Sequence, residues 1–451
     1  MPQPQVAAQQ ADRRVHNFNE VSLGFSRKIA VEEARRCIQC KSPQCVSGCP
    51  IGIDIPGFVR NLRDGNLNEA YQVIKQSNPF PAICGRICSA QCEGACILKD
   101  KDGAIAIRAL ERFTADFGKT KTIKNKPLDK SSKKVAIIGS GPTGLSAAFV
   151  LTKKGYAVTV FESFDRAGGV LRYGVPEFRI PKKILDGEIN DIKALDVKFE
   201  MNCLVGKTVT LEELLNQQGF AAVLLATGAA VPRFLDIPGV NLGGVYYGEE
   251  FLMRVNLMKS GIFSRYIPNF VIGSKILVVG SGNTALDCAR SAVRLGREVK
   301  LIFKATEEDM RVRPSEREYA KEEGIKFEPM SRPVEIIAGE DNFVKAVKCV
   351  RMDYAELDKK GNWTLDEVPG SEFEIEADTL IIAIGHKPNA LLAKMSPALD
   401  VGEDGTIEVD EDGLTSIDRV YAAGNVVSNA RQVIDAIASG MVVAESMAER
   451  I

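Results

Sequence analysis

"VAIIGSGPTGLSAAFVLTKKGYAVTVFE", residues 135–162, decides the fold class of this 451-residue chain. An apolar run leads into a glycine-rich turn and a helix-like segment, and a second apolar run ends at an acid. In such a unit the glycines allow a tight turn and close approach of a pyrophosphate, which faces the helix N-terminus. The acid bonds a ribose hydroxyl. The stretch therefore predicts a dinucleotide site at Gly139, Gly141, Gly144 and Glu162.

The same pattern recurs in "KILVVGSGNTALDCARSAVRLGREVKLIFK", residues 275–304, with Gly280, Gly282 and Ala285 in the turn. Its second apolar run ends with Lys304, where a site specific for NAD usually carries an acid. A basic residue there can pair with the 2′-phosphate of NADP, and Arg311 could assist. We therefore expect NADPH, with a solvated strand-end charge as the alternative for Lys304.

Short β-branched runs alternate with helix-like segments through the rest of the chain, from "KVAIIGS" to "RVYAAGN". This alternation predicts the α/β class, with doubly wound parallel sheets covered by helices on both faces. Two such units imply two dinucleotides, and FAD with a nicotinamide nucleotide is the natural pair because hydride passes between their rings. The late stretch 420–440 offers a strand, a Gly-Asn turn and a helix, whose amide end could face the flavin's developing negative charge.

The cysteines precede this region, with eight of the 11 between Cys37 and Cys96. In a reducing cytosol such density indicates metal ligands rather than disulfides, and the presence of only two histidines disfavours a Cys/His zinc site. The first group, in "RRCIQCKSPQCVSGCP" (35–50), resembles the bacterial ferredoxin run, in which the cysteine before proline binds the other cluster. A closing ligand must then come from elsewhere in the chain.

The second group, in "CGRICSAQCEGAC" (84–96), has a cysteine at every fourth position. On one continuous helix these four would span ~18 Å at 1.5 Å per residue, which is too long for one compact cluster. Either the segment is not helical, as Gly85 and Gly94 suggest, or its cysteines serve two clusters.

Composition narrows the classes of partner and compartment. The net charge of −1 gives no reason to expect nucleic acid or an anionic membrane as an obligatory partner. No apolar run approaches the ~20 residues that span a bilayer, and the first residues lack the apolar stretch of a signal peptide, so we expect a cytoplasmic protein. A basic, polar stretch at residues 118–134 is a linker candidate.

Several motifs together resemble a known family. They include "RCIQCKSPQCVSGCPIGIDIPGF", "GGVLRYGVPEFRIPK", "VVGSGNTALDCAR", "AIGHKPN" and "VYAAGN", and the likeness covers essentially the whole chain. The chain resembles the glutamate synthase small (β) subunit and its relatives, among them sulfide dehydrogenase and the large subunit of the bifurcating NADH-dependent ferredoxin:NADP oxidoreductase. In length and in its first cysteine motif it looks most like that transhydrogenase subunit.

The resemblance implies an α-helical domain with two [4Fe–4S] clusters, followed by two Rossmann-like domains of the glutathione reductase and adrenodoxin reductase type. The implied boundaries are 1–120 for the cluster domain, 121–133 for a linker, 134–240 and 373–451 for the FAD domain, and 241–372 for the NAD(P)H domain. For FAD the resemblance carries over Gly139, Gly141, Pro142, Gly144, Glu162, Gly169, Leu171, Gly424, Asn425 and Val433. For NADPH it carries over Gly280, Gly282, Asn283, Thr284, Ala285, Lys304, Arg311 and Gly385.

The family pattern also divides the cysteines between two clusters. It groups Cys37, Cys40, Cys45 and Cys96 at one cluster and Cys49, Cys88 and Cys92 at the other. Simple counting nominates Cys84 as the eighth ligand, whereas in the family a carboxylate or amide at the position of Glu111 can serve instead. Oxygen is a poorer match than thiolate for such clusters.

Three positions depart from the family. Asn425 stands where an aspartate is usual beside the ribityl chain, and Ala305 stands where relatives often have a second basic residue, which leaves NADH possible. Cys88 and Cys92 are separated by three residues, where relatives usually have five.

The resemblance implies an electron-transfer subunit that oxidises NADPH through FAD and passes single electrons through its clusters to a partner. Candidate partners are a small flavoprotein or iron–sulfur subunit, the large subunit of glutamate synthase, or ferredoxin. The first alternative is the small subunit of NADPH-dependent glutamate synthase. A second alternative, from another class, is a non-catalytic assembly protein that binds zinc and nucleotides.

Overall fold

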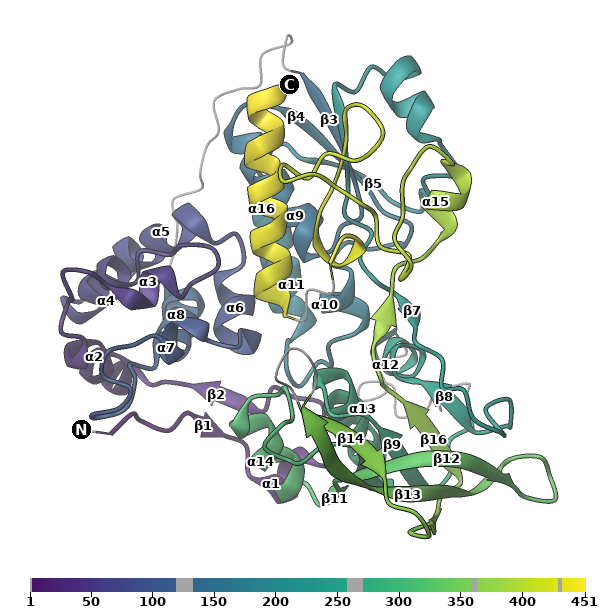
Figure 1. Cartoon of the computed structure of the whole chain (residues 1–451). Helices are drawn as coiled ribbons and strands as arrows, with labels where there is room; N and C mark the ends of the chain where they lie inside the picture. Colours follow the sequence, from purple (N-terminus) through teal and green to yellow (C-terminus); the bar gives the residue numbers. More distant parts are fainter. Residues whose placement is uncertain (1, 119–132, 258–270, 358–362, 429–431) are drawn as a thin grey trace.

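The computed structural model describes residues 2–118, 133–257, 271–357, 363–428 and 432–451. Three bodies are visible in Figure 1: a helical cysteine domain, a first nucleotide domain that carries the C-terminal helix, and a second nucleotide domain. The predicted linker at 121–133 lies outside the described residues except for Lys133.

The first nucleotide domain is built on a five-stranded parallel sheet in the order β18-β6-β3-β4-β5. Successive side chains of a strand point to opposite faces, so Val135 and Ile137 join the core beneath α9 and α16, whereas Ala136 and Ile138 join the core on the other face. The elements are β3 (Lys134–Ile138), α9 (Pro142–Lys153), β4 (Ala157–Phe161), α10 (Val170–Tyr173), α11 (Lys182–Lys193), β5 (Lys198–Glu200), η1 (Glu213–Gln217), β6 (Ala222–Leu225), α15 (Leu391–Met395), β18 (Val420–Ala422), η2 (Gly424–Val426) and α16 (Val433–Arg450).

The second nucleotide domain has a parallel sheet in the order β11-β10-β9-β16-β8 and an antiparallel sheet, β12-β13-β14, with β15 paired to β13. Both parallel sheets confirm the predicted fold class. The elements are β8 (Val245–Tyr247), α12 (Gly248–Leu257), β9 (Lys275–Val279), α13 (Asn283–Arg294), β10 (Glu298–Ile302), α14 (Pro314–Glu322), β11 (Lys326–Glu328), β12 (Ser331–Ala338), β13 (Val344–Leu357), β14 (Trp363–Glu367), β15 (Phe373–Glu376) and β16 (Thr379–Ile382).

The predicted boundary at residue 373 is wrong. Strand β15 pairs with β13, and β16 lies between β9 and β8, so both belong to the second nucleotide domain. The chain returns to the first nucleotide domain only after β16. An apolar run such as that of β16 suits the centre of either parallel sheet equally well, so its sequence does not say which sheet it joins.

The chain crosses between the two nucleotide domains twice. The two crossings meet in a short antiparallel ribbon of β7 (Val231–Pro232) and β17 (His386–Lys387). Figure 1 shows β7 between the two domains.

The cysteine domain shares one continuous apolar core with the first nucleotide domain. At their contact, Glu188 on α11 accepts hydrogen bonds from the backbone N–H groups of Ala82 (2.7 Å) and Ile83 (3.3 Å), which begin α6 and have no partner within that helix. Lys75 also pairs with Asp191 of α11, at 2.9 Å. The helices of this domain are α2 (Arg27–Arg36), α3 (Gln44–Ser47), α4 (Ile55–Arg63), α5 (Leu67–Ser77), α6 (Pro81–Ile87), α7 (Gln91–Gly94) and α8 (Ile107–Phe117).

The N-terminal arm, residues 7–24, leaves the cysteine domain and runs beside the second nucleotide domain. It consists of β1 (Ala7–Ala8), α1 (Ala11–Arg14) and β2 (Ser22–Gly24), and α1 lies next to α14 in Figure 1. Among the described helices, none combines the length and the apolar character that crossing a membrane requires.

Candidate functional site

The turn between β3 and α9 has the close contacts that the glycine pattern predicts. A Cβ on Gly139, whose φ is +106°, would lie 2.5 Å from the carbonyl oxygen of Ala226, and a Cβ on Gly144 would lie 2.0 Å from that of Gly139. Both positions therefore exclude any side chain. Gly141 caps α9 and has open space around it, so a ligand could approach its backbone closely.

Glu162 follows β4 and lies beside this turn. Its carboxylate is buried and accepts hydrogen bonds from the backbone N–H groups of Ser140 and Phe164, both at 3.0 Å, and from the Ser140 hydroxyl. These donors hold the acid next to the turn, in the position where the motif expects a ribose hydroxyl.

Two further segments converge on the same turn. Gly169 approaches so closely that its Cβ would lie 2.8 Å from Cα of Gly141, and Leu171 is buried in the short helix α10 that follows. From the C-terminal part, a Cβ on Gly424 would lie 2.3 Å from Oγ1 of Thr143, on α9. The structure thus brings together the predicted FAD residues from three stretches of sequence.

Asn425 provides a direct test of whether these residues fit a flavin nucleotide. Its side-chain oxygen is buried and has no hydrogen-bond partner among the described residues. Buried polar atoms are normally paired, so an orphaned acceptor indicates a missing donor. The ribityl hydroxyls of FAD are donors of the required kind. Val433, the first residue of α16, begins the helix that follows.

The turn between β9 and α13 repeats this construction. A Cβ on Gly280, whose φ is +139°, would lie 2.3 Å from the carbonyl oxygen of Ala383 and 3.2 Å from Cβ of Ala285. Gly282 caps α13 and has open space around it, and Asn283 and Thr284 are the first two residues of that helix.

The two basic residues predicted for the 2′-phosphate are both exposed. Strand β10 ends at Ile302 rather than at Lys304, which lies two residues beyond it. Neither Lys304 nor Arg311 takes part in any ion pair given for the described part of the chain. Their charges are therefore available to a ligand.

Gly385 follows β16 with a φ of +110°, and its carbonyl oxygen accepts a hydrogen bond of 2.9 Å from the N–H of Arg233. Sequence reasoning missed its neighbour His386, whose Nε2 lies 3.2 Å from a carboxylate oxygen of Glu249 on α12. Burial raises the pKa of Glu249 to about 7 and lowers the pKa of His386. The chain has only two histidines, and this scarcity was the sequence feature that could have drawn attention to His386.

The first cysteine set is Cys37, Cys40, Cys45 and Cys96, and these four line one cavity of about 50 Å³. Burial, together with the negative charges of the other three thiolates, raises the pKa of Cys45 to about 11. Such thiols ionise together at neutral pH only when a cation lies among them. An iron–sulfur cluster provides that charge.

The second cysteine set is Cys49, Cys88 and Cys92, and it faces Glu111 on α8. Burial, together with the charges of Glu111 and Cys49, raises the pKa of Cys88 to about 12. Burial likewise raises the pKa of Glu111 to about 8, while the Asn78 side chain donates a 2.7 Å hydrogen bond to its carboxylate.

The break between α6 and α7 separates the evenly spaced cysteines. Helix α6 ends at Ile87, and Ala90 adopts the left-handed conformation with a φ of 60° before α7 begins. The four cysteines therefore do not lie on one helix, and Cys96 joins the first set while Cys88 and Cys92 remain in the second.

Close packing of α6 against α8 places Glu111 at the second set. A Cβ on Gly85 would lie 2.5 Å from Cα of Arg112, so only glycine permits this approach. Cys84 is fully buried in α6, and its sulfur lies 3.7 Å from the side-chain oxygen of Asn78. Burial raises the pKa of Cys84, and the charges of Glu111 and Cys88 contribute, so Cys84 is also near the second set.

In the described part of the chain, no three His, Cys, Asp or Glu side chains are grouped as ligands of a single metal ion. A zinc ion needs all its sulfurs at about 2.3 Å from one point. In a four-iron cluster each thiolate binds a different iron, so the ligands stand farther apart. The thiols of these sets are the donor type that iron–sulfur clusters take.

Comparisons with known proteins cover nearly the whole chain. Residues 14–123 match the family model described as dihydropyrimidine dehydrogenase domain II, 4Fe-4S cluster, and residues 123–440 match the model of pyridine nucleotide-disulphide oxidoreductases. The small chain of an NADPH glutamate synthase from Azospirillum brasilense is 35% identical over 97% of this chain and 92% of its own length.

A second relative is longer than this chain. The β subunit of an NADP⁺-dependent formate dehydrogenase from Moorella thermoacetica is 37% identical over 88% of this chain, which spans only 58% of that protein. Among solved structures, FprA of Mycobacterium tuberculosis in complex with NADPH has a TM-score of 0.56 at 21% identity, covering 70% of this chain and 85% of that one. This likeness confirms the fold of the two nucleotide domains.

Proposed function

The chain belongs to the family of pyridine nucleotide-disulphide oxidoreductases that carry an N-terminal 4Fe-4S domain, and on this premise we propose that it is an electron-transfer subunit oxidising NADPH. Bound FAD would supply the exchange between a two-electron hydride and single electrons, and two bound [4Fe–4S] clusters would carry the single electrons. The recipient would be a partner redox protein.

One observation carries the proposal. The second cysteine set adjoins the helix that begins beside the flavin residues, because Gln91, next to Cys92, lies 3.4 Å from Asp435 in the first turn of α16. The continuous core of the cysteine and first nucleotide domains holds this arrangement rigidly. This arrangement would place the second cysteine set on the side of the flavin site from which single electrons leave.

We propose which residues would hold each group, with the geometry described above as support. The β3–α9 turn, Glu162 and Asn425 would hold FAD, and the β9–α13 turn with Lys304 and Arg311 would hold NADPH. The first cysteine set would hold one cluster by four thiolates. For the second set we assign Glu111 as the fourth ligand, because the charge of Glu111 acts on all three of its thiols. Cys84 is the alternative.

The partner is proposed from the relatives. One relative is named as the small chain of glutamate synthase and another as a subunit of formate dehydrogenase, so a second subunit is expected. The chain alone should reduce dyes or a ferredoxin-like acceptor but form no glutamate. A small flavoprotein, an iron–sulfur subunit and a synthase large subunit remain the candidates, and co-purification from the native cell would decide among them.

The decisive experiment is an anaerobic spectrum with metal analysis. The protein should be yellow-brown, contain one FAD and about eight irons, and lose visible absorbance when NADPH is added. Failure of both NADPH and NADH to bleach a fully loaded sample would refute the proposal. A colourless protein with stoichiometric zinc would instead support the non-catalytic alternative.

A charge reversal at Lys304 should change the choice of nucleotide. In Lys304→Glu, repulsion of the 2′-phosphate should raise the KM for NADPH by at least about tenfold, while kcat and the KM for NADH stay within about twofold. Dye-reduction kinetics with both nucleotides measure this. Lys394→Glu, on exposed helix α15 of the other nucleotide domain, makes the same change in net charge and should have no such effect. Equal losses with both nucleotides would contradict the assignment of Lys304.

A further inference from the structure

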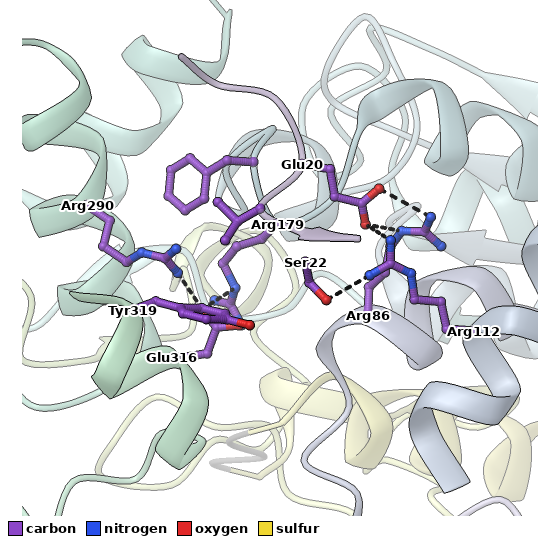
Figure 2. Close-up of a pocket in the computed structure, with 10 residues that line it drawn as sticks. Glu20, Ser22, Arg86, Arg112, Arg179, Arg290, Glu316 and Tyr319 are labelled. Atoms are coloured by element: carbon purple, nitrogen blue, oxygen red, sulfur yellow. Dashed lines mark hydrogen bonds and ion pairs between the residues drawn. The ribbon is translucent and has the colours of Figure 1, made fainter. Parts of the chain in front are cut away.

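Three parts of the chain meet around a small cavity of about 20 Å³ (Figure 2). Arg86 and Arg112 reach it from the cysteine domain, Arg179 from the first nucleotide domain, and Arg290 and Glu316 from the second. Guanidinium and carboxylate groups from all three bodies line this cavity. Ion pairs among them can fix how the three bodies are oriented relative to one another.

Arg179 makes polar contacts between the two nucleotide domains at this junction. It lies between α10 and α11, and its side chain is 8% exposed. Its Nη1 donates a 2.7 Å hydrogen bond to the carboxylate of Asp287, and Nη2 lies 3.5 Å from the side-chain oxygen of Asn283. Its Nε is 3.9 Å from a carboxylate oxygen of Glu316.

Asn283 and Asp287 belong to the helix that the nucleotide motif defines. Helix α13 begins at Asn283, immediately after the glycine turn, and Asp287 lies one turn later on the same helix. Arg179 therefore holds the N-terminal turn of the helix at which the NADPH pyrophosphate is expected. The covalent links between the two domains, by contrast, form a short ribbon built on the two-residue strands β7 and β17.

We propose that Arg179 is a positioning residue for hydride transfer, which holds α13, and with it the nicotinamide nucleotide, in register with the flavin site. This inference rests on the proposed function. Arg179 needs no contact with either ring, because it acts through Asp287 and Asn283. A guanidinium suits this role because its planar fork engages two acceptors in a fixed geometry.

Contacts of the preceding residue, Phe178, hold the backbone at Arg179 in place. The carbonyl oxygen of Phe178 accepts a 3.0 Å hydrogen bond from the N–H of Val21 in the N-terminal arm. The Phe178 ring lies against the guanidinium groups of Arg290 and Arg294, whose carbons are 4.9 and 4.0 Å from the ring centre. The residue before Arg179 is thus held through its backbone by the arm and through its ring by the second nucleotide domain.

The N-terminal arm reaches the second nucleotide domain at an adjoining point. Nε of Arg14 lies 2.7 Å from a carboxylate oxygen of Glu323, which also pairs with Arg290 at 2.9 Å and Arg294 at 2.7 Å. Through this shared carboxylate, the arm and the cation pair that holds Phe178 form one buried network. Arg290 and Arg294 both lie on α13, so the network ties the C-terminal half of that helix to the arm, while Arg179 contacts its N-terminal turn.

The test is anaerobic stopped-flow reduction of the flavin at saturating NADPH. Arg179→Gln should slow this step at least about tenfold, while the Kd for NADPH changes less than about threefold, because the nucleotide still binds but is held out of register. Dithionite should still reduce the flavin and the clusters fully. If Arg179→Gln does not fold, Arg179→Lys, which keeps the charge and loses the fork, should show the same separation of rate from affinity.

A double-mutant cycle separates positioning from general damage. If Arg179 acts through Asp287, the double variant with Asp287→Asn should be no slower than Arg179→Gln alone. Arg112→Gln removes a buried arginine of the same cavity whose ion pairs, with Glu20 and Asp116, stay within the N-terminal part, and it should leave the rate within about twofold. Three outcomes would overturn the inference. They are flavin reduction in Arg179→Gln at the wild-type rate, additive effects on this rate in the double-mutant cycle, and an equal loss of rate in Arg112→Gln. A wild-type protein that NADPH and NADH do not reduce would instead overturn the proposed function.

Discussion

A Glu111→Ala protein prepared without oxygen is expected to contain about four irons instead of about eight. The substitution leaves the second cysteine set with three thiolates and no oxygen ligand, and it leaves the Asn78 amide without its acceptor at 2.7 Å. The first set has no contact with Glu111 among those described and should keep its cluster. Iron and sulfide analysis, with electron paramagnetic resonance of the reduced protein, would measure the loss.

Two matched variants identify the ligand. Glu111→Gln keeps an oxygen at the same place and should retain about eight irons. Cys84→Ala removes a buried thiol in the same helix pair and should also retain them, with a loss of stability of about 1 kcal/mol typical of a small core truncation. The reverse pattern, with four irons lost in Cys84→Ala and none in Glu111→Ala, would show that Cys84 is the eighth ligand.

A Gly144→Ala protein should lose FAD and become less stable by about 3 kcal/mol or more. The added methyl group would lie 2.0 Å from the carbonyl oxygen of Gly139, so helix α9 must move away from the turn that it closes. The ratio of flavin to protein absorbance and the thermal unfolding of the FAD-free protein measure the two effects separately.

Other glycines provide the controls. Gly141→Ala meets no atom of the described residues within 4 Å, so the FAD-free protein should unfold like the wild type, but FAD should bind more weakly because the methyl group occupies the approach to the pyrophosphate. Gly187→Ala, on the exposed part of α11, also meets nothing and should raise stability by about 0.5 to 1 kcal/mol without affecting FAD. Normal FAD content in Gly144→Ala would contradict the packing argument.

The two nucleotide turns could be derived from the sequence because their determinants are local. Gly139, Gly144 and Glu162 lie within one strand–helix–strand unit, and the spacing of apolar residues defines both strands and the helix. The same holds for Gly280 and Ala285. The period of apolar residues and the spacing of glycines extend over only a few residues, so they can be read from the sequence without knowledge of the tertiary structure.

The boundary at residue 373 was predicted wrongly because its determinants are not local. The strand Thr379–Ile382 is recognisable as a buried strand, but its neighbours β9 and β8 lie more than 100 residues earlier in the chain. Pairing between distant strands depends on which surfaces the folded helices leave open. A short apolar run therefore does not predict which sheet its strand joins.

By itself, the sequence determined two dinucleotide-binding folds and predicted a group of thiols suited to metal, because turns, strands and ligand types are encoded locally. The family resemblance implied how those thiols divide, but only the tertiary structure gives the physical reason, since the break at Ala90 and the packing of α6 on α8 bring Cys96 to one set and Glu111 to the other. It alone also joined Arg179 to Asp287, which are 108 residues apart. Contacts of this kind form only when separate cores have packed against each other, and no local pattern of residues specifies them.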